Sequence, residues 1–168
     1  AVLFGRHVWL INLPPRARWK RDATAWLQGV PRPAPRSAAA LAYDPVRART
    51  VLYGGLGPCA GFQCPSFADT WEFDGVAWTQ IAATGPGARN SAGMAFDAVR
   101  NRIVLAGGVG GCVPSCATKF GDAWDWNGVQ WTLRSTSAPA ANGIALAFDS
   151  TRGVSVAHLG QRFPSAFV

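Results

Sequence analysis

The chain has 168 residues, of which 49% are hydrophobic and 15% charged, a balance typical of a globular domain and not of a disordered chain. Its 19 glycines and 12 prolines are spread among short apolar runs, which favours many turns and short strands over long helices. The net charge of +7 is concentrated in residues 1–36, so the remainder is nearly neutral. This distribution favours solubility and local ion pairs and does not favour nucleic acid as a partner.

The opening segment, AVLFGRHVWLINLPP, is apolar but lacks the basic start and the small-residue cleavage site of a signal peptide. It falls in register with later repeats, so we expect it to belong to the mature fold. No apolar stretch approaches the roughly 20 residues needed to cross a bilayer, and the sequence therefore predicts no membrane span.

The first repeated unit covers about residues 1–30, with strands expected at about 2–4, 18–22 and 25–28. Its segment RWKRDATAWLQ contains Trp19 and Trp26, seven residues apart. The same part of the chain is rich in arginine, a residue that can hold phosphate or carboxylate in bidentate fashion. Its candidate polyanion-binding residues are Arg16, Arg18, Lys20 and Arg21.

The second unit, about residues 36–82, repeats this pattern in a fuller form. Four strands are expected at about 38–43, 50–54, 70–74 and 77–81, bounded by Gly, Pro and Asp. In TWEFD, aromatic residues alternate with polar ones, as in a half-buried strand. The tight connection Asp74-Gly75 indicates a hairpin.

The third unit, about residues 89–134, repeats the second almost phrase by phrase. ARNSAGMAFDAVRNRIVLAGG matches PRSAAALAYDPVRARTVLYGG, and DAWDWNGVQWTL matches DTWEFDGVAWTQ. A fourth, incomplete unit at about 142–160 begins the phrase again with ANGIALAFDSTRGVSVAHLG and predicts two strands. Four antiparallel strands in a period of about 53 residues describe one blade of a β-propeller.

A Gly-Gly doublet that closes an apolar strand, followed by a variable loop and two Trp around an Asp/Asn-Gly turn, resembles the kelch motif of bacterial kelch-repeat and galactose-oxidase-like proteins. Gly54-Gly55 and Gly107-Gly108 match the doublet. The resemblance implies an all-β fold of kelch-type propeller blades, about three per chain, in one region spanning 1–168. Copper-oxidase relatives need a set of His and Tyr ligands that this chain does not match, so no cofactor is expected.

Three blades do not obviously close a ring, because closed propellers usually have four to eight. Three arrangements are therefore open: a piece of a longer propeller, an unusually small ring, or a homodimer forming a six-bladed ring. In the dimer, residues 18–28 of one copy would complete the blade that residues 143–158 of the other begin.

Residues that recur in every unit are predicted to be structural. The acids of the turns precede an arginine by three positions, a spacing at which the carboxylate can accept bonds from turn amides and pair with the cation. They are Asp44 with Arg47, Asp97 with Arg100 and Asp149 with Arg152. Asp69, Asp122, Asp74 and Asp22 are interpreted in the same way.

The four cysteines lie in the long loops that follow the Gly-Gly doublets. Their close spacing predicts two local disulfides, Cys59–Cys64 and Cys112–Cys116, in an oxidising compartment. A shared metal site is the alternative, but the C-x4-C and C-x3-C spacings differ from those of the usual zinc and iron–sulfur motifs, and no metal is expected. The protein is therefore expected to be extracellular or periplasmic.

Only His7 and His158 could supply an imidazole, and neither has a second His or an evident acid partner near it in sequence. His158 occupies the position of Tyr53 and Ala106 in the other units, so it breaks the pattern. Both are weak candidates for catalysis. No nucleophile elbow, P-loop or HExxH motif is present in the sequence.

The leading functional hypothesis is a binding or scaffold module that recognises a protein or glycan through loops 56–68 and 109–121, because recognition commonly resides in loops on a rigid scaffold. The candidate binding residues are Phe62, Gln63, Phe67, Lys119 and Phe120. One alternative is a secreted hydrolase or lyase acting on carbohydrate at the central channel. Another is polyanion binding by segment 16–36, with a steep dependence on salt.

Overall fold

The computed structural model describes residues 18–21, 26–29, 32–61, 64–81, 85–112, 116–138 and 140–159. These residues form β-strands joined by turns and loops and contain no helix. The strands are β1 (Arg18–Arg21), β2 (Trp26–Gly29), β3 (Ala40–Asp44), β4 (Arg49–Tyr53), β5 (Thr70–Phe73), β6 (Trp78–Ile81), β7 (Gly93–Asp97), β8 (Arg102–Ala106), β9 (Val109–Cys112), β10 (Cys116–Lys119), β11 (Ala123–Trp126), β12 (Trp131–Ser135), β13 (Ile144–Asp149) and β14 (Val154–Leu159).

Two four-stranded antiparallel sheets form the centre of the structure. The first has the order β3-β4-β5-β6 and the second the order β7-β8-β11-β12. Equivalent strands pair in the same register, so that Phe73 faces Trp78 in one sheet as Trp126 faces Trp131 in the other. The expectation of four antiparallel strands in each of these two units is confirmed, with strand ends within about two residues of those predicted.

The turns form where the sequence pattern placed them. The Asp44 carboxylate accepts hydrogen bonds from the backbone N–H groups of Val46 and Arg47, at 3.0 and 3.1 Å, and Asp97 and Asp149 repeat the arrangement. In the β5–β6 and β11–β12 hairpins, Gly75 and Gly128 adopt φ values of 97° and 95°, which favour glycine.

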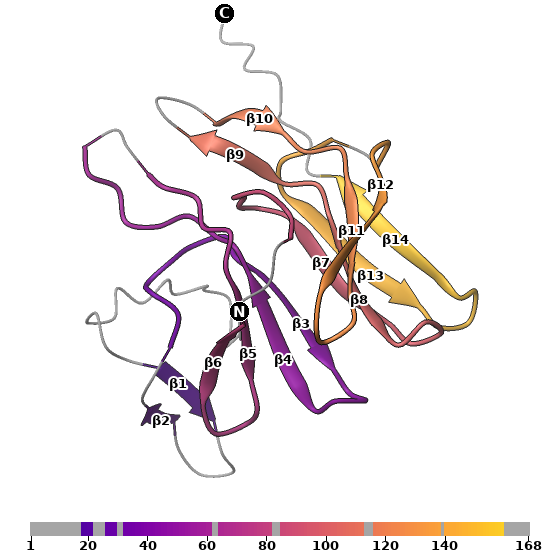
Figure 1. The fold of residues 1–168 in the computed structure, drawn as a ribbon, viewed down its shortest axis with the longest axis horizontal. Coiled ribbons are helices and arrows are strands. Elements are labelled where there is room, and N and C mark those ends of the chain that lie inside the picture. Colours follow the sequence, from indigo (N-terminus) through magenta and orange to yellow (C-terminus); the bar gives the residue numbers. More distant parts are fainter. Residues whose placement is uncertain are drawn as a thin grey trace, which may run out of the picture.

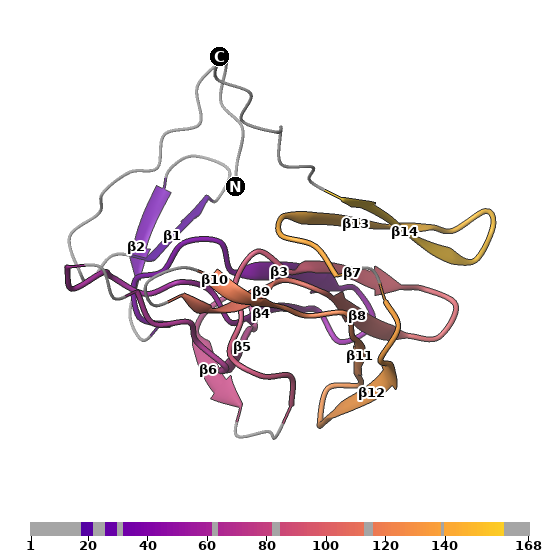
Figure 2. The same ribbon diagram turned by 90° about the horizontal axis from the view of Figure 1, so that it is seen from above.

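The sheets succeed one another with their first strands side by side (Figures 1 and 2). Strand β7 contacts β3 on one side and β13 on the other. It is accordingly buried along most of its length, whereas every residue of β14 is exposed. The β1–β2 pair lies on the opposite side of the molecule from β13 and β14 in both views.

The main core fills the space between the two four-stranded sheets. Val51 and Tyr53 from β4 face Trp126 and Trp131 from the second sheet, and all four side chains are buried. The Trp131 ring meets Tyr53 edge-on at 5.2 Å between centroids. Both indole N–H groups donate across the gap, to the carboxylate of Glu72 and to the hydroxyl of Thr70.

Strand β5 differs from the simple expectation for an alternating strand. Its polar residues Thr70 and Glu72 are buried, at 2% and 7% exposure, while the aromatic residues Trp71 and Phe73 are only half-buried. The reason is that the polar side chains supply acceptors for the two indole N–H groups that cross from the second sheet.

A second difference lies in segment 109–121, which was expected to be a variable loop. It contains the two-stranded antiparallel sheet β9–β10, and Val109, the first residue of β9, is buried. A side chain at Gly110 would meet the backbone oxygen of Ala88 and the ring of Phe120, so this close approach requires glycine.

Candidate functional site

Loops 56–68 and 109–121 leave the same edge of neighbouring sheets (Figure 1). In the first loop, Gly57 N–H donates to the Pro65 carbonyl and Phe67 N–H to the Gly55 carbonyl, each at 2.8 Å. A disulfide joins Cys59 to Cys64, as the sequence predicted. The described part of this loop is therefore held at its base by backbone bonds and near its tip by a covalent link.

The roots of the two loops are joined to each other. The backbone of Arg89 donates to the Phe67 carbonyl at 3.1 Å and accepts from Gly55 at 2.9 Å. Its neighbour Asn90 exchanges two 2.9 Å backbone bonds with Val109, at the start of β9. The two loops consequently form one continuous edge, which we call the loop face.

A buried arginine supports each loop from below. The Arg89 guanidinium, 1% exposed, holds both carboxylate oxygens of Asp122 at 2.6 and 2.9 Å and donates to the Gly107 carbonyl at 2.9 Å. It also lies over the Phe120 ring, 3.9 Å from its centroid. This set of contacts fixes the end of β8, the start of β11 and the returning loop together.

The first sheet repeats the arrangement 53 positions earlier in the sequence. Arg36 holds both oxygens of Asp69, donates to the Gly54 carbonyl and stacks on Phe67 at 3.9 Å. The indole N–H of Trp71 also donates to Asp69, at 2.7 Å. Asp69 and Asp122, which were predicted to be structural, each bind the arginine that lies beneath a loop.

The five candidate binding residues fall into three groups. The rings of Phe67 and Phe120 carry the buried arginines on one face, so they serve the base of the loop face. Lys119 is exposed at the end of β10. Phe62 and Gln63 lie outside the described residues. Lys119 is therefore the described candidate that is free to meet a ligand.

The arginine contacts change the acidity of their partners. Burial alone would raise the pKa of Asp122, but hydrogen bonds from Arg89 and Trp124 outweigh it and hold the pKa below its ordinary value. The pKa of Asp69 is lowered in the same way, by Arg36 and Trp71.

We expect this shift to appear as acid sensitivity. A carboxyl whose pKa is lower in the folded than in the unfolded state stabilises the fold above the unfolded pKa of about 3.9, and this contribution is lost as pH falls through the folded value. Urea unfolding followed between neutral pH and about pH 2 should show stability falling below about pH 4. An Asp122→Asn variant should be less stable at neutral pH and show a shallower fall. An unchanged slope would contradict the assignment.

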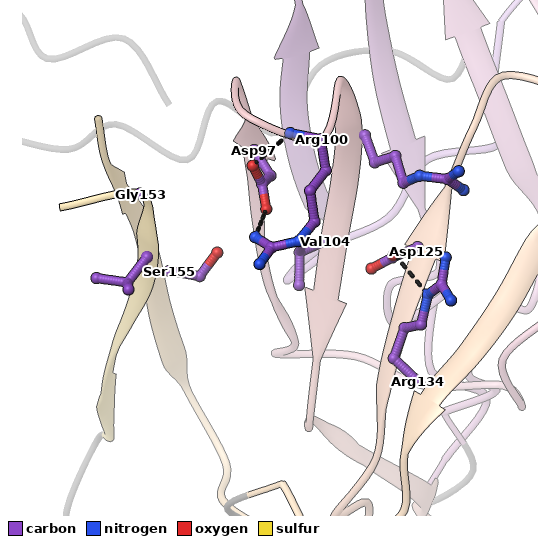
Figure 3. Close-up of a pocket in the computed structure, with 9 residues that line it drawn as sticks. Asp97, Arg100, Val104, Asp125, Arg134, Gly153 and Ser155 are labelled. Atoms are coloured by element: carbon purple, nitrogen blue, oxygen red, sulfur yellow. Dashed lines mark hydrogen bonds and ion pairs between the residues drawn. The ribbon is translucent and has the colours of Figure 1, made fainter. Parts of the chain in front are cut away.

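An open pocket of about 720 Å³ lies between the second sheet and the β13–β14 pair (Figure 3). Asp97, Arg100 and Val104 line it from the β7–β8 side, and Gly153 and Ser155 line it from the other. The remaining lining residues are Arg102, Asp125, Arg134 and Val154.

The acids of the pocket already have partners. Arg100 donates to Asp97 at 2.7 Å, and Arg134 donates to Asp125 at 2.7 Å (Figure 3). Asp125 is nonetheless only 7% exposed, and its carboxylate faces the pocket. A pocket at these residues was not predicted from the sequence.

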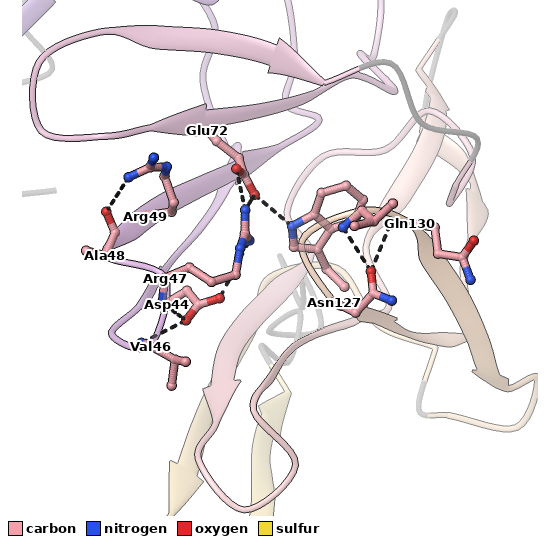
Figure 4. Close-up of polar contacts among 10 residues, drawn as sticks. Asp44, Val46, Arg47, Ala48, Arg49, Glu72, Asn127 and Gln130 are labelled. Atoms are coloured by element: carbon pink, nitrogen blue, oxygen red, sulfur yellow. Dashed lines mark hydrogen bonds and ion pairs between the residues drawn. The ribbon is translucent and has the colours of Figure 1, made fainter.

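The first sheet uses its equivalent residues differently (Figure 4). Arg47 lies between Asp44 and Glu72, with one guanidinium nitrogen 2.6 Å from both carboxylate oxygens of Glu72 and another nitrogen 3.6 Å from Asp44. The sequence predicted a simple pair of Asp44 with Arg47 across this turn. In the structure Arg47 contacts Glu72 as well, because Glu72 lies close enough to compete for the arginine. Asp97 with Arg100 and Asp149 with Arg152 do form the predicted pairs.

Other candidates are placed as follows. His158 is exposed on β14, opposite Ala145 in the strand register. Cys112 and Cys116 face each other in the β9–β10 register, but their side chains lie outside the described part of the chain. The described residues contain no cluster of three or more potential metal-ligating side chains. His7, Arg16 and the side chains of Arg18, Lys20 and Arg21 also fall outside the described set.

Comparison with known proteins supports the fold alone. No protein-family model matches the chain, and no curated protein matches it. A solved structure titled "Structure of YjhT" is similar, with a TM-score of 0.61 and 15% sequence identity over 78% of this chain. The match covers 48% of that structure's chain, so the present chain spans about half its length. The described residues contain no helix long and apolar enough to cross a membrane. The chain is thus an all-β protein of several antiparallel sheets, with a disulfide in one of its loops.

Proposed function

We propose that the chain forms part of a kelch-like β-propeller that acts as a binding module, with the loop face as its recognition surface. Support for the propeller comes from sheets that repeat the same strand order and stand with their first strands adjacent. The proposal places the protein outside the cytoplasm, because a disulfide in an exposed loop is typical of an oxidising compartment.

The observation that carries the proposal is the way in which the two loops are held. Backbone bonds join their roots, a disulfide fixes one tip, and a buried arginine lies beneath each. Rigid loops lose little conformational entropy when they bind, which favours recognition. At the other edge, the turns that the structure describes in the two four-stranded sheets are tight and are stabilised by their own aspartate or asparagine side chains. The partner class is a protein or glycan, met by backbone groups and by Lys119.

The test is a screen of the intact chain against immobilised oligosaccharides and extracellular proteins, followed by affinity measurement with two loop-face variants. Lys119→Glu and the double variant Cys59→Ser/Cys64→Ser should weaken binding about tenfold or more, which corresponds to about 1.4 kcal/mol. Gln130→Glu, at an exposed turn on the opposite edge, is the matched control and should bind as the parent does. A ligand whose affinity falls with Gln130→Glu and not with the loop variants would contradict the proposal.

A further inference from the structure

The pocket lies beside the second sheet. The equivalent space beside the first sheet is filled by side chains. On the first sheet, the wall formed by Val51 and Glu72 is covered by Trp126 from the outer hairpin β11–β12, and Val51 is 0% exposed. On the second sheet, Val104 and Asp125 occupy the same register positions. There, however, these two residues line an open pocket.

The pocket is open because β13–β14, as described, has no outer hairpin. In the second sheet, β8 pairs with β7 on one side and with β11 on the other. Strand β14, which holds the place of β8, pairs only with β13 among the described residues. Ser155 and Ala157 of β14 are exposed, whereas Ile103 and Leu105, at the same register positions of β8, are completely buried. The apolar residues Val154 and Val156 of β14 are exposed as well. A free strand edge beside exposed apolar residues is a surface suited to strand addition.

We propose that this pocket is the seat of an outer β-hairpin, and that its occupant is the β1–β2 hairpin of a second copy of the chain. In the resulting dimer, the β1–β2 hairpin of each copy extends the β13–β14 sheet of the other. The pocket of each copy is then filled by side chains of its partner's hairpin. The ionic core of the contact joins Asp125 of one copy to the hairpin of the other.

The β1–β2 hairpin fits because it has the outer-hairpin register and, among the described residues, is not joined to a larger sheet. It is a two-stranded sheet in which Arg21 pairs with Trp26, the position of the Trp126–Trp131 and Phe73–Trp78 pairs. Trp126 is the residue whose indole N–H donates to the carboxylate of Glu72. The hairpin therefore carries arginine at the position that meets the wall carboxylate, which on the second sheet is Asp125. Asp125 already accepts from Arg134, but on the first sheet Glu72 accepts from Arg47 and from Trp126 at once, so a wall carboxylate can bind a second donor.

The positions of the two elements favour exchange between copies. The β1–β2 hairpin and the β13–β14 sheet lie on opposite sides of the molecule (Figures 1 and 2). A hairpin on one side and its seat on the other allow two copies to satisfy each other reciprocally about a two-fold axis. After the exchange, two such chains would have six four-stranded sheets, a number within the range of closed propellers.

The test is a charge-swap experiment on the full chain, with mass measured by light scattering on a sizing column over a wide range of concentrations. The parent chain should be a dimer. Arg21→Glu and Asp125→Arg each place like charges at both contacts of a homodimer, so each variant alone should be a monomer. An equimolar mixture of the two should recover the dimer, because one of its contacts is the parent pair and the other is the reversed pair.

Gln130→Arg is the control for added charge away from the seat, and it should remain a dimer. Circular dichroism of each variant reports whether the sheets are intact. The chain that carries both Arg21→Glu and Asp125→Arg has the reversed pair at both contacts, so it should dimerise even if Asp125→Arg alone folds poorly. A parent that is monomeric at every concentration overturns the proposal. So do single variants that stay dimeric, and so does a mixture that stays monomeric, since closure within one chain would not respond to mixing. Lys119→Glu should leave the dimer unchanged, so failure of the loop-face proposal can be distinguished from failure of this one.

Discussion

Replacing Arg89 with alanine is expected to lower the free energy of unfolding by about 3–5 kcal/mol, the cost of leaving one member of a buried ion pair without its partner. The change removes the two bonds to Asp122, the bond to the Gly107 carbonyl and the contact with the Phe120 ring. The carboxylate of Asp122 would retain the indole N–H of Trp124, which does not neutralise its charge. Chemical denaturation followed by tryptophan fluorescence measures the loss.

Two further substitutions make this prediction specific. Arg89→Lys keeps the charge but cannot reproduce the bidentate geometry, so it should remain clearly destabilised. Arg152→Ala removes an arginine–aspartate pair of similar length in which the arginine side chain is 76% exposed, and it should cost far less than Arg89→Ala because solvent screens the exposed pair. Equal losses for Arg89→Ala and Arg152→Ala would show that the buried arginine does not hold the sheets and loops together.

Trp131→Ala should also cost about 3–5 kcal/mol, as for other large aromatic residues removed from a core. Trp131 is 6% exposed, lies edge-on to Tyr53 and donates its indole N–H to Thr70 at 2.9 Å across the gap between sheets. Its loss would open a cavity and leave a buried hydroxyl without this donor. Calorimetry and urea unfolding both measure the effect.

The repeat supplies an internal control for this result. Trp78 holds the equivalent position in the first sheet, but it is only half-buried and packs against Phe73, 5.3 Å away between centroids. Trp78→Ala should therefore be distinctly less destabilising than Trp131→Ala. Comparable losses would mean that the space between the two four-stranded sheets is not the main core.

The strands could be predicted from the sequence because their signals are local and occur more than once. Asp74-Gly75 and Asn127-Gly128 demand tight hairpins, and the aspartates at 44, 97 and 149 form the turns expected of them. The Cys59–Cys64 disulfide was likewise predicted from spacing, and it is present. Such features depend on neighbours within a few residues, which a sequence displays directly.

The features that escaped prediction depend on contacts between distant residues. Arg36 and Arg89 were not singled out, although their recurrence 53 residues apart, each in step with an Asp and a Phe, was a signal that could have found them. The β9–β10 pair was missed because its glycine-rich strand has no alternating pattern to mark it. The pocket could not be predicted from the sequence, because it lies between the second sheet and the β13–β14 pair and depends on how these two sheets are placed.

The backbone bonds between neighbouring units also bear on how the molecule opens. Ser91 N–H donates to the Ala38 carbonyl, and the Ser91 carbonyl accepts from Gly143, so each sheet is tied to the next near the start of its first strand. Because each unit touches only its neighbours, local unfolding can begin at an end of the array and advance one sheet at a time. In a single copy we expect such fraying to start at strand β14, which is exposed throughout, and the amide protons of the buried strand β7 to exchange last. The cooperativity of unfolding therefore depends on how strongly the outermost sheet is bound to its neighbour.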